Sequence, residues 1–502
     1  MKIKISNCSS IGKFMILVGI MVGVPMLVIP FYPTEAEYLR DFIFPSIGSI
    51  FAGLLMCFFS KSEDTGFEWE STMHKTSLTV MFAWCWGVLV GAGPFVIGKH
   101  LTWIQAIFEA VSGWTTTGLS VMDVSATPKI FLFHRSFMQY CGGLGFVMMM
   151  ILIISNKQSM ALYNAEGHPD KLMPTLKQTA CVIFLMYNGF LVVGTIAYCV
   201  SGMELFDSIC HTMCSLSTGG FSTKLNSIGE YNNLAIEIIT IVLMLIGTTN
   251  FAALLLLTRR KWKKFFSVSE VRFMFGLLII FIPVTAISLS DKLGISYIEG
   301  LRKSAFDVVS ALSTSGYSSM SYARWPSFAI GVLILMMVIG GGVGSTAGGI
   351  KLTRVYLMLK IALLNLYRRL SPSRRVAFPT YIKPQGKAVI DASLVSDTAS
   401  FIAAYLALYI LGSLLLTVTA GCGLMEGMFE FASALSTVGL SIGLTNPATN
   451  NATLIVEILG MLIGRLEIFI VIIAIYSGGS VLKKRFGSRL LKEIDRKHMR
   501  SK

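Results

Sequence analysis

The chain has 502 residues, of which 54% are hydrophobic and 14% are charged, and its mean hydropathy is +0.69. Because soluble domains carry about a quarter charged residues, this composition excludes a soluble protein and indicates several membrane spans. The net charge of +15 does not indicate a nucleic-acid partner, because basic residues cluster beside apolar stretches, at 259–264, 368–375 and 483–492. Such clusters are typical of the cytoplasmic ends of membrane helices, where they also contact the lipid bilayer.

Residues 1–75 predict two transmembrane helices, at 11–31 and 42–60. Each apolar run is long enough for a hydrocarbon core of about 30 Å. The first run follows several lysines, as a signal peptide does, but it is long and has no clear small-residue cleavage site. We therefore expect it to be a retained helix.

The rest of the chain contains a fourfold repeat. The pattern [WL]-[ST]-T-x-G-[LFY]-S recurs in four segments, which are 108–120, 210–222, 306–318 and 429–441. Its glycines are Gly118, Gly220, Gly316 and Gly439, separated by 102, 96 and 123 residues. Four copies at near-regular spacing indicate that one structural unit is present four times.

Apolar runs on both sides of each copy complete the unit. One span precedes the copies, at 76–97, 178–200, 271–289 and 392–420. A second span follows them, at 130–154, 234–258, 327–361 and 452–481. Between the first span and the repeat lies an amphipathic segment of about three helical turns, too short to cross a membrane. Each unit is therefore predicted to be helix, re-entrant pore helix, filter loop and helix (M1-P-M2), because irregular backbone at membrane depth must be buried or line a water-filled path.

The predicted fold is an all-α polytopic membrane protein, in which four M1-P-M2 repeats surround one pore and two extra transmembrane helices precede them. This arrangement has ten spans and four pore helices. The repeats are expected at 76–170, 171–264, 265–370 and 392–482.

The residues shared by the four loops suit a cation. Residues 437–441 read T-V-G-L-S, which differs at two positions from the T-V-G-Y-G signature of potassium-channel filters. A glycine lets each backbone turn its carbonyls toward one axis, and the C-terminal end of each pore helix carries partial negative charge. The predicted K⁺ filter consists of Thr116, Thr117, Gly118, Thr218, Gly219, Gly220, Thr314, Ser315, Gly316, Thr437, Val438 and Gly439. The serines that follow could also offer hydroxyls to an ion, with ordinary Ser/Thr turns as the alternative for any one copy; they are Ser120, Ser222, Ser318 and Ser441.

Each predicted pore helix also carries one acidic or imidazole side chain. Glu109, Asp307 and Glu430 are expected near the N-terminal ends of their helices, where a carboxylate favours the positive end of the dipole. His211 takes this place in the second unit. We interpret these residues as mainly structural, with direct ion contact as the alternative. The segment 210–214 (CHTMC) resembles a metal site, but one helical turn offers at most three ligands, so helix packing is the favoured interpretation.

The four M1-P-M2 units with one glycine per filter resemble the Trk/Ktr/HKT superfamily of potassium transporters. The two extra N-terminal helices and the length resemble its bacterial TrkH/TrkG branch, as do the segments 161–171 and 246–255. In that family a serine at the first filter position goes with sodium preference. Gly118 occupies this position here, so the resemblance implies a preference for potassium.

A glycine-rich segment interrupts the second span of the third unit. Its glycines are Gly340, Gly341, Gly342, Gly344, Gly348 and Gly349. A phosphate-binding P-loop would need lysine directly after the glycine, where Ile350 stands. The break predicts an intramembrane loop at 340–350, as in other broken transporter helices, with a packing kink as the alternative. The resemblance implies that this loop is a gate beneath the filter.

Arg465 lies thirteen residues into the last predicted helix, about 20 Å from its start at 1.5 Å per residue. At that depth its guanidinium must face protein or water. A structural ion pair with Glu467 or Glu457 is one interpretation. The resemblance favours a pore-facing arginine that acts as an electrostatic barrier beside the gate.

The polar linker 371–391 is predicted to be cytoplasmic and to form a hairpin that turns at 384–386, a possible docking point for a soluble partner. The resemblance implies a homodimer that works with a cytosolic, TrkA-like nucleotide-binding subunit. The chain has no nucleotide-binding motif of its own, so nucleotide control would come from that partner. The basic tail 483–502 and the N-terminus are expected in the cytoplasm.

The function predicted from these features is potassium uptake through a selective, gated pore in a bacterial cytoplasmic (inner) membrane. The alternative is a symporter that couples K⁺ to H⁺ or Na⁺. An intramembrane enzyme is not expected, because the spans lack HExxH, GxSxG and paired-aspartate motifs. No cofactor is expected in this chain, and K⁺ is the transported ion.

Overall fold

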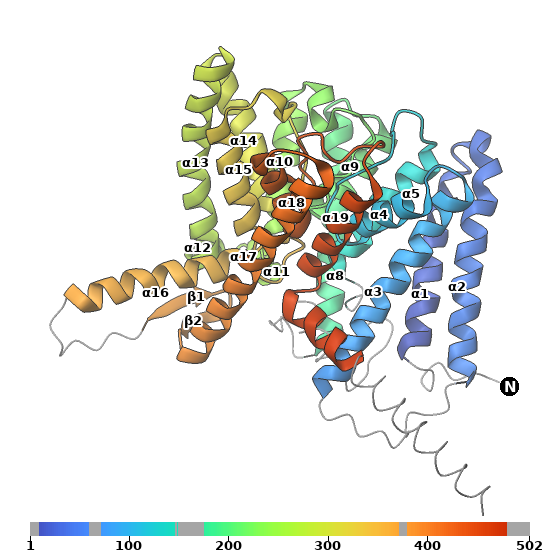
Figure 1. Ribbon diagram of the computed structural model, residues 1–502, viewed down its shortest axis with the longest axis horizontal. Helices are drawn as coiled ribbons and strands as arrows, with labels where there is room; N and C mark the ends of the chain where they lie inside the picture. Colours follow the sequence, from blue (N-terminus) through green and yellow to red (C-terminus); the bar gives the residue numbers. More distant parts are fainter. Residues whose placement is uncertain (1–9, 60–71, 146–147, 149–174, 371–378, 479–502) are drawn as a thin grey trace, which may run out of the picture.

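The protein consists mainly of long helices, many of which stand side by side (Figure 1). The computed structural model describes residues 10–59, 72–145, 148, 175–370 and 379–478. Six of the described helices are long and apolar enough to cross a membrane, or eight if each of two bent helix pairs is one span. The predicted count of ten also includes 130–154 and 327–361. In the first, the described helix is α5, with 16 residues; the second is divided into α15, with 13 residues, and the start of α16.

The N-terminal helices α1 (Ser10–Gly23) and α2 (Leu39–Phe59) form a closely packed pair joined by η2 (Val24–Val28) and η3 (Pro33–Tyr38). Glycines allow the two helix backbones to lie this close together, because a Cβ on Gly12 would lie only 2.8 Å from the Gly53 carbonyl oxygen. A Cβ on Gly53 would lie 2.6 Å from the Gly12 carbonyl oxygen. Close backbone contact of this kind is typical of helix pairs in membranes.

Each repeat contains a first helix, a short pore helix and a second helix. The first helices are α3 (Thr72–Ile97), α8 (Leu176–Val200), α13 (Ser269–Leu293) and α17 (Ala392–Ala420). The pore helices are α4 (Trp103–Trp114), α9 (Leu205–Leu216), α14 (Tyr297–Ser313) and α18 (Leu424–Leu435). The second helices begin with α5 (Lys129–Leu144), α10 (Leu234–Thr248), α15 (Ser327–Ile339) and α19 (Asn451–Arg465). The shorter connecting elements are η4 (Ser227–Tyr231), α12 (Trp262–Ser267) and η5 (Tyr322–Arg324).

Polar side chains determine where several of these helices begin. The side chains of Thr175, Asn233, Asp391 and Asn450 each accept a hydrogen bond from a backbone N–H in the first turn of α8, α10, α17 and α19 respectively. Such N-caps satisfy donors that have no partner within the helix.

Two of the second helices differ from the prediction. The spans 234–258 and 452–481 were expected to be continuous, and both are bent. The axis of α10 turns by 118° into α11 (Phe251–Thr258), and that of α19 turns by 105° into the helix Ile468–Gly478. In the third unit the chain leaves the helix at Gly340 and re-enters it at α16 (Leu352–Leu370), as the glycines predicted. Within the described residues, the second helices of the second, third and fourth units are therefore broken.

A hairpin of β1 (Thr380–Lys383) and β2 (Gly386–Val389) forms the two-stranded sheet of the described chain. Its turn confirms the prediction of a hairpin in the linker. The strands lie beside α16, and the hairpin and α16 together project from the helix bundle (Figure 1). Leu357 of α16, Tyr381 and Ile390 form a small buried cluster that joins the two.

Large apolar side chains cover the outside of the bundle. Ile279 of α13 is 72% exposed, Val418 of α17 is 82% exposed, and Val200 of α8 is 83% exposed. A water-facing surface would not carry apolar side chains on helices this long, whereas a lipid-facing surface does. The chain is therefore a multi-pass membrane protein.

Candidate functional site

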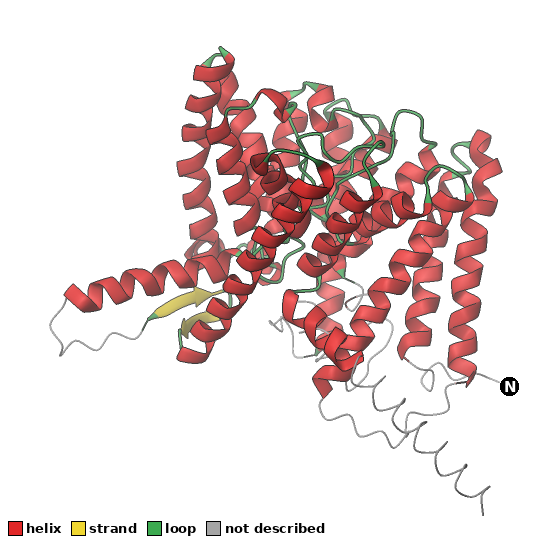
Figure 2. Ribbon diagram, in the orientation of Figure 1, coloured by secondary structure: helices red, strands yellow, loops and turns green. Residues whose placement is uncertain are grey.

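The four pore helices end at the predicted filter loops. Each helix stops one or two residues before the shared threonine, and an irregular loop follows, which is interrupted by η4 in the second unit and by η5 in the third. Figure 2 shows several loops, in green, close together among the helices of the bundle. Three of the pore helices have 12 residues, about 18 Å at 1.5 Å per residue, which is too short to cross a bilayer.

The four loops share one backbone conformation. The threonine of each loop has a φ between 52° and 56°, and the glycine two residues later has a φ between 72° and 98°. The threonines are Thr116, Thr218, Thr314 and Thr437. The intervening residue donates its backbone N–H to a carbonyl of the pore helix five residues earlier, at 2.8–3.0 Å. The conformation is therefore fixed in the same way four times.

The loops form a closed ring. A Cβ added to Gly118 would collide with the carbonyl oxygen of Gly219 in the second loop, and one on Gly220 would collide with that of Ser315 in the third. The ring then closes in the same direction. A Cβ on Gly316 would meet the carbonyl oxygen of Val438, and one on Gly439 would meet that of Thr117 in the first loop. The structure thus brings all twelve predicted filter residues together, in the cyclic order of the units.

The pore-helix side chains clamp the chain that follows the ring. Glu109 accepts hydrogen bonds from the Ser120 hydroxyl at 3.0 Å and the Val121 N–H at 3.1 Å. Equivalent contacts occur in the other units: His211 with the Ser222 hydroxyl, Asp307 with Ser319, and Glu430 with Ser441 and Ile442. The expected position near the helix N-termini was wrong, because Glu109 and Glu430 are the seventh residues of 12-residue helices. From that point they reach the loop beyond the filter.

An open cavity of about 360 Å³ lies on one side of the ring. Its lining includes the four glycines of the ring and the four predicted serines Ser120, Ser222, Ser318 and Ser441. Arg135 and Lys224 also reach it. We call this cavity the vestibule. Its shape allows a hydrated ion to approach the ring from this side.

The glycine-rich loop lies against the opposite side of the ring, where it contacts filter threonines. The hydroxyl of Thr346 is 3.1 Å from that of Thr218, and the backbone N–H of Gly348 donates to the Thr314 hydroxyl at 2.8 Å. A Cβ on Gly348 would collide with the Ser436 carbonyl and the Thr437 hydroxyl. The loop therefore occupies the space directly beside three of the four filter loops.

Neighbouring helices hold this loop in place. The Glu270 carboxylate of α13 accepts a hydrogen bond from the Val343 N–H at 2.7 Å. At the bend between α10 and α11, the Thr248 carbonyl accepts from the Gly342 N–H at 2.9 Å, and the Phe251 N–H donates to the Gly344 carbonyl at 3.1 Å. The broken helix of the second unit is thus the docking point for the loop of the third.

Arg465 joins the loop to a third element. Its guanidinium donates to the Thr346 carbonyl at 2.9 Å and to the Gly142 carbonyl of α5 at 2.6 Å. Of the two predicted ion-pair partners, Glu467 pairs with Arg354 at 2.9 Å, and Glu457 lies 3.0 Å from the Thr445 hydroxyl. Arg465 is the last residue of α19 and not part of a continuous long helix, so it sits at a helix end beside the loop.

Several residues of this site were missed by the sequence prediction. Gln139 of α5 donates to the Gly219 carbonyl at 2.6 Å and accepts from the Phe221 N–H at 3.0 Å, which fixes the second filter loop. Thr346, Glu270 and Arg135 also contact the loops described above. Gln139 and Arg135 are polar residues inside the predicted span 130–154, and that was the signal available for finding them, whereas Thr346 lies in the glycine-rich segment.

The chain is similar to known transport proteins over most of its length. The sequence profile of the TrkH family, described as a cation transport protein, matches residues 49–480. The Trk system potassium uptake protein TrkH of Halomonas elongata is 31% identical over 410 residues, which are 77% of this chain and 82% of that protein. The Trk system potassium uptake protein TrkG of Escherichia coli is 31% identical over 415 residues, 80% of this chain and 84% of that protein.

The fold has a close counterpart among solved structures. The crystal structure of the potassium transporter TrkH from Vibrio parahaemolyticus superimposes with a TM-score of 0.80 and 26% sequence identity, and covers 92% of this chain and 96% of that one. Together with the match of the family profile, this shows that the chain belongs to the TrkH family of cation transport proteins, a family of transporters and not of enzymes.

Proposed function

We propose that this protein takes up K⁺ through a selective, gated pore in the cytoplasmic (inner) membrane, with both termini in the cytoplasm. The observation that carries the proposal is the closed ring of four loops, with a vestibule on one side and the glycine-rich loop on the other. Passage would be driven by the membrane potential, which is worth about 2.3 kcal/mol per charge per 100 mV.

The chemistry of the ring favours a cation. Backbone carbonyls of the four loops replace part of the ion's hydration shell, and the pore helices direct the partially negative ends of their dipoles toward the ring. All four ring positions are glycine, including Gly118 at the position where a serine goes with sodium preference in the superfamily. This composition supports K⁺ as the transported ion, and the filter residues as its binding site.

The glycine-rich loop and Arg465 are proposed to be the gate. The loop blocks the path sterically where it contacts Thr218 and Thr314. A positive charge roughly 6 Å from the path would raise the energy of a cation by about 2.8 kcal/mol at an effective dielectric of ~20. Opening requires the loop to leave the filter threonines, and Arg465 holds it there through the Thr346 carbonyl.

Regulation is proposed to come from outside the chain. The hairpin and α16 pack on each other and extend away from the bundle (Figure 1). Arg354 of α16 forms an ion pair with Glu467, which lies two residues after the end of α19 and therefore close to Arg465 and the glycine-rich loop. A cytosolic nucleotide-binding subunit that moves α16 would therefore act on the gate. We propose a homodimer as the working assembly with such a subunit.

Flux in proteoliposomes tests the function. The purified protein should carry K⁺ and Rb⁺ down their gradients much faster than Na⁺, and the current should reverse at the K⁺ equilibrium potential. A reversal potential that shifts with a pH or Na⁺ gradient at fixed K⁺ would favour the alternative, a coupled symporter. Absence of any K⁺ flux from folded protein, with and without the cytosolic subunit, would refute the proposal.

A further inference from the structure

Two carboxyl groups meet behind the fourth filter loop. Glu430 is the seventh residue of α18 and Glu457 the seventh residue of α19, and both are fully buried. The Thr445 hydroxyl lies between them, 2.6 Å from an oxygen of Glu430 and 3.0 Å from an oxygen of Glu457.

The hydrogen bonds around Glu430 identify it as the ionised member. It accepts from the Ser441 hydroxyl at 2.6 Å, from the Ile442 N–H at 3.2 Å and from the Thr445 N–H at 3.1 Å, in addition to the Thr445 hydroxyl. A carboxylate with several donors is a satisfied anion even when it is buried.

Glu457 has no comparable set of donors. The single proton of the Thr445 hydroxyl is directed to Glu430, which is the nearer acceptor, so it does not also serve Glu457. The second oxygen of Glu457 has no hydrogen-bond partner among the described residues. A buried carboxylate without donors is strongly unfavourable, whereas a carboxylic acid can donate its own proton to the Thr445 oxygen.

Among the described residues, no basic side chain is paired with Glu457. Among the described helices, α4, α17 and α18 make the most extensive contacts with α19. From α18 the group that faces Glu457 is the Glu430 carboxylate. On α4, Glu109 is paired with Arg135, and on α17 the hydroxyls of Tyr405 and Tyr409 contact the Ser436 hydroxyl and the Met428 carbonyl respectively. Arg465 lies eight residues further along α19, about 12 Å at 1.5 Å per residue.

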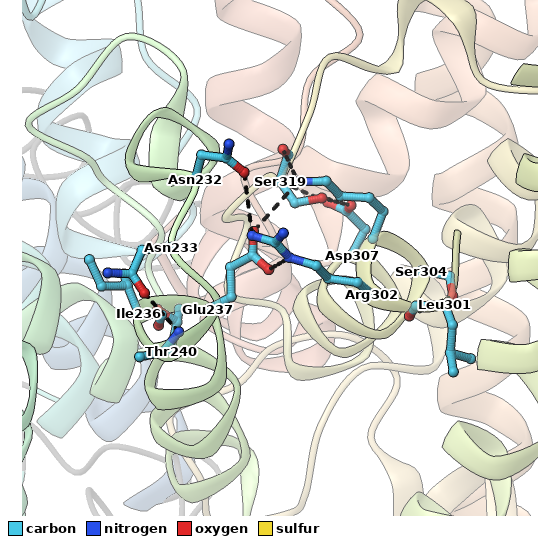
Figure 3. A network of polar contacts seen from close by, with 12 residues as sticks. Asn232, Asn233, Ile236, Glu237, Thr240, Leu301, Arg302, Ser304, Asp307 and Ser319 are labelled. Carbon is cyan, nitrogen blue, oxygen red and sulfur yellow. Dashed lines mark hydrogen bonds and ion pairs between the residues drawn. The ribbon is translucent and has the colours of Figure 1, made fainter. Parts of the chain in front are cut away.

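The first unit shows which residue occupies the same helix position, and the second unit shows how another buried acid is paired. In the first unit, Arg135, the seventh residue of α5, binds Glu109 at 2.5 Å. In the second unit, Glu237 of α10 binds Arg302 of α14 at 2.6 Å, and Figure 3 shows the two side chains pointing toward each other. Each of these acids has a basic partner. In the fourth unit an acid occupies the position of the arginine.

We infer that Glu457 is a proton-binding site, in which one proton takes the place that a basic side chain has in the first unit. Thr445 also lines the vestibule, so protons reach the site from that side. Loss of the proton places two carboxylates on either side of Thr445, and their repulsion displaces the segment 441–445 that follows Gly439 in the filter. Transport therefore falls as the pH on the vestibule side rises. This consequence for transport rests on the proposed function, whereas the protonation of Glu457 does not.

Infrared difference spectroscopy tests the protonation directly. In detergent at neutral pH, Glu457→Gln should remove one C=O stretching band of a protonated carboxyl group from the spectrum of the folded protein. Glu204→Gln is the matched control, because the Glu204 side chain is 61% exposed and paired with Lys129, so its loss removes an ionised carboxylate. An unchanged protonated-carboxyl band in Glu457→Gln would overturn the inference. The band in the wild-type protein should also disappear when the pH is raised, and this test needs no variant. A band that persists up to the pH at which the protein unfolds would overturn the role of Glu457 as a switch.

Flux measurements test the consequence. Wild-type flux should fall as the pH on the vestibule side rises, and Glu457→Gln should lose this dependence. Glu457→Arg should also be insensitive to pH, because it can pair with Glu430 as Arg135 pairs with Glu109. A wild-type pH profile in both variants would overturn the switch. If none of the proteins transports K⁺ at any pH, the proposed function fails, and the infrared result still decides on the proton.

Discussion

Four threonines of the filter loops adopt a backbone conformation that residues other than glycine rarely adopt. Their φ values lie between 52° and 56°. This conformation costs about 1–2 kcal/mol for each residue with a Cβ, so the surrounding structure must hold it. The hydrogen bond from the next N–H to the pore helix does so in every loop. The repetition of a costly conformation supports the interpretation of the ring as the functional site.

Gly316→Ser should reduce both K⁺ uptake and discrimination against Na⁺. Its Cβ would collide with the Val438 carbonyl oxygen, and its φ of 77° disfavours any side chain. Overpacking of this kind costs about 1–3 kcal/mol, which corresponds to a roughly 5- to 150-fold loss of flux if it falls on ion passage. Isotope uptake with competing Na⁺ would measure both effects.

The matched control is Gly331→Ser on α15, where an added Cβ has no atom within 4 Å. It should transport like wild type. The serine substitution at Gly118, Gly220 or Gly439 should act as at Gly316, because the four share one ring. Unaltered affinity and selectivity in all four ring variants would show that the ring is not the filter.

Removing one member of the buried ion pair in the first unit should destabilise the protein. Arg135→Gln leaves the fully buried Glu109 without its charged partner, and breaking a buried pair in this way costs about 3–5 kcal/mol. Thermal unfolding in detergent would measure the loss. The double variant with Glu109→Gln should recover much of it, since no charge is then left unpaired; equal loss in both variants would contradict this account.

At the scale of elements, periodic features were predictable and bends were not. Four pore helices and the break at Gly340 follow from a repeated motif and a cluster of glycines, both of which are visible in the sequence. The bends after α10 and α19 interrupt apolar runs that have the length and hydropathy of a single span. At the first bend Asn250 caps α11 by accepting from the Ala252 N–H at 2.7 Å. The polar residues at 248–250 were the available signal.

The contacts of the glycine-rich loop were also beyond prediction from the sequence. Glycines indicated a loop at 340–350, but not that it would contact the filter threonine of its own unit and that of the second unit. Those contacts join residues more than 30 and more than 120 positions apart, and single-sequence patterns report only local structure. The same limit applies to Glu457, whose significance depends on Glu430 and Thr445.

Weakening the gate loop should raise K⁺ flux and reduce its dependence on a cytosolic subunit. Thr346→Val keeps the shape of the side chain but removes the hydroxyl contacts with Thr218 at 3.1 Å and the Gly247 carbonyl at 2.9 Å. Arg465→Ala removes the contacts to the Thr346 and Gly142 carbonyls and the positive charge. If that charge costs a passing cation about 2.8 kcal/mol, flux should rise on the order of a hundredfold.

Thr258→Val, at an exposed position of α11, is the control for the threonine variant and should leave flux unchanged. Flux must be expressed per folded molecule, because a purely structural role of Arg465 would lower the yield of folded protein instead. Well-folded Arg465→Ala protein with wild-type flux and regulation would exclude a gating role.

At the scale of the whole molecule, one chain closes the ring by itself. The fourth loop meets the first where a Cβ on Gly439 would collide with the Thr117 carbonyl, and α19 packs against α4 at the same seam. The Gln105 side chain adds a hydrogen bond to the Pro447 carbonyl at 3.0 Å. Each subunit of an oligomer would therefore contain its own complete ring of four loops.

A heterodimer of one wild-type and one Gly316→Ser subunit tests this conclusion. If each chain holds a separate pore, a heterodimer isolated through two different tags should retain about half of the wild-type flux, with unchanged K⁺ selectivity. A pore shared at the interface would instead be disabled by the defective subunit, because its ring would contain the obstructed loop, and flux would be nearly abolished. The wild-type dimer carrying the same two tags is the control for the effects of purification. Failure to recover any doubly tagged protein from co-expressed, folded subunits would count against the proposed homodimer. In that case, the flux of the singly tagged wild-type chain would still show whether one chain is sufficient for transport.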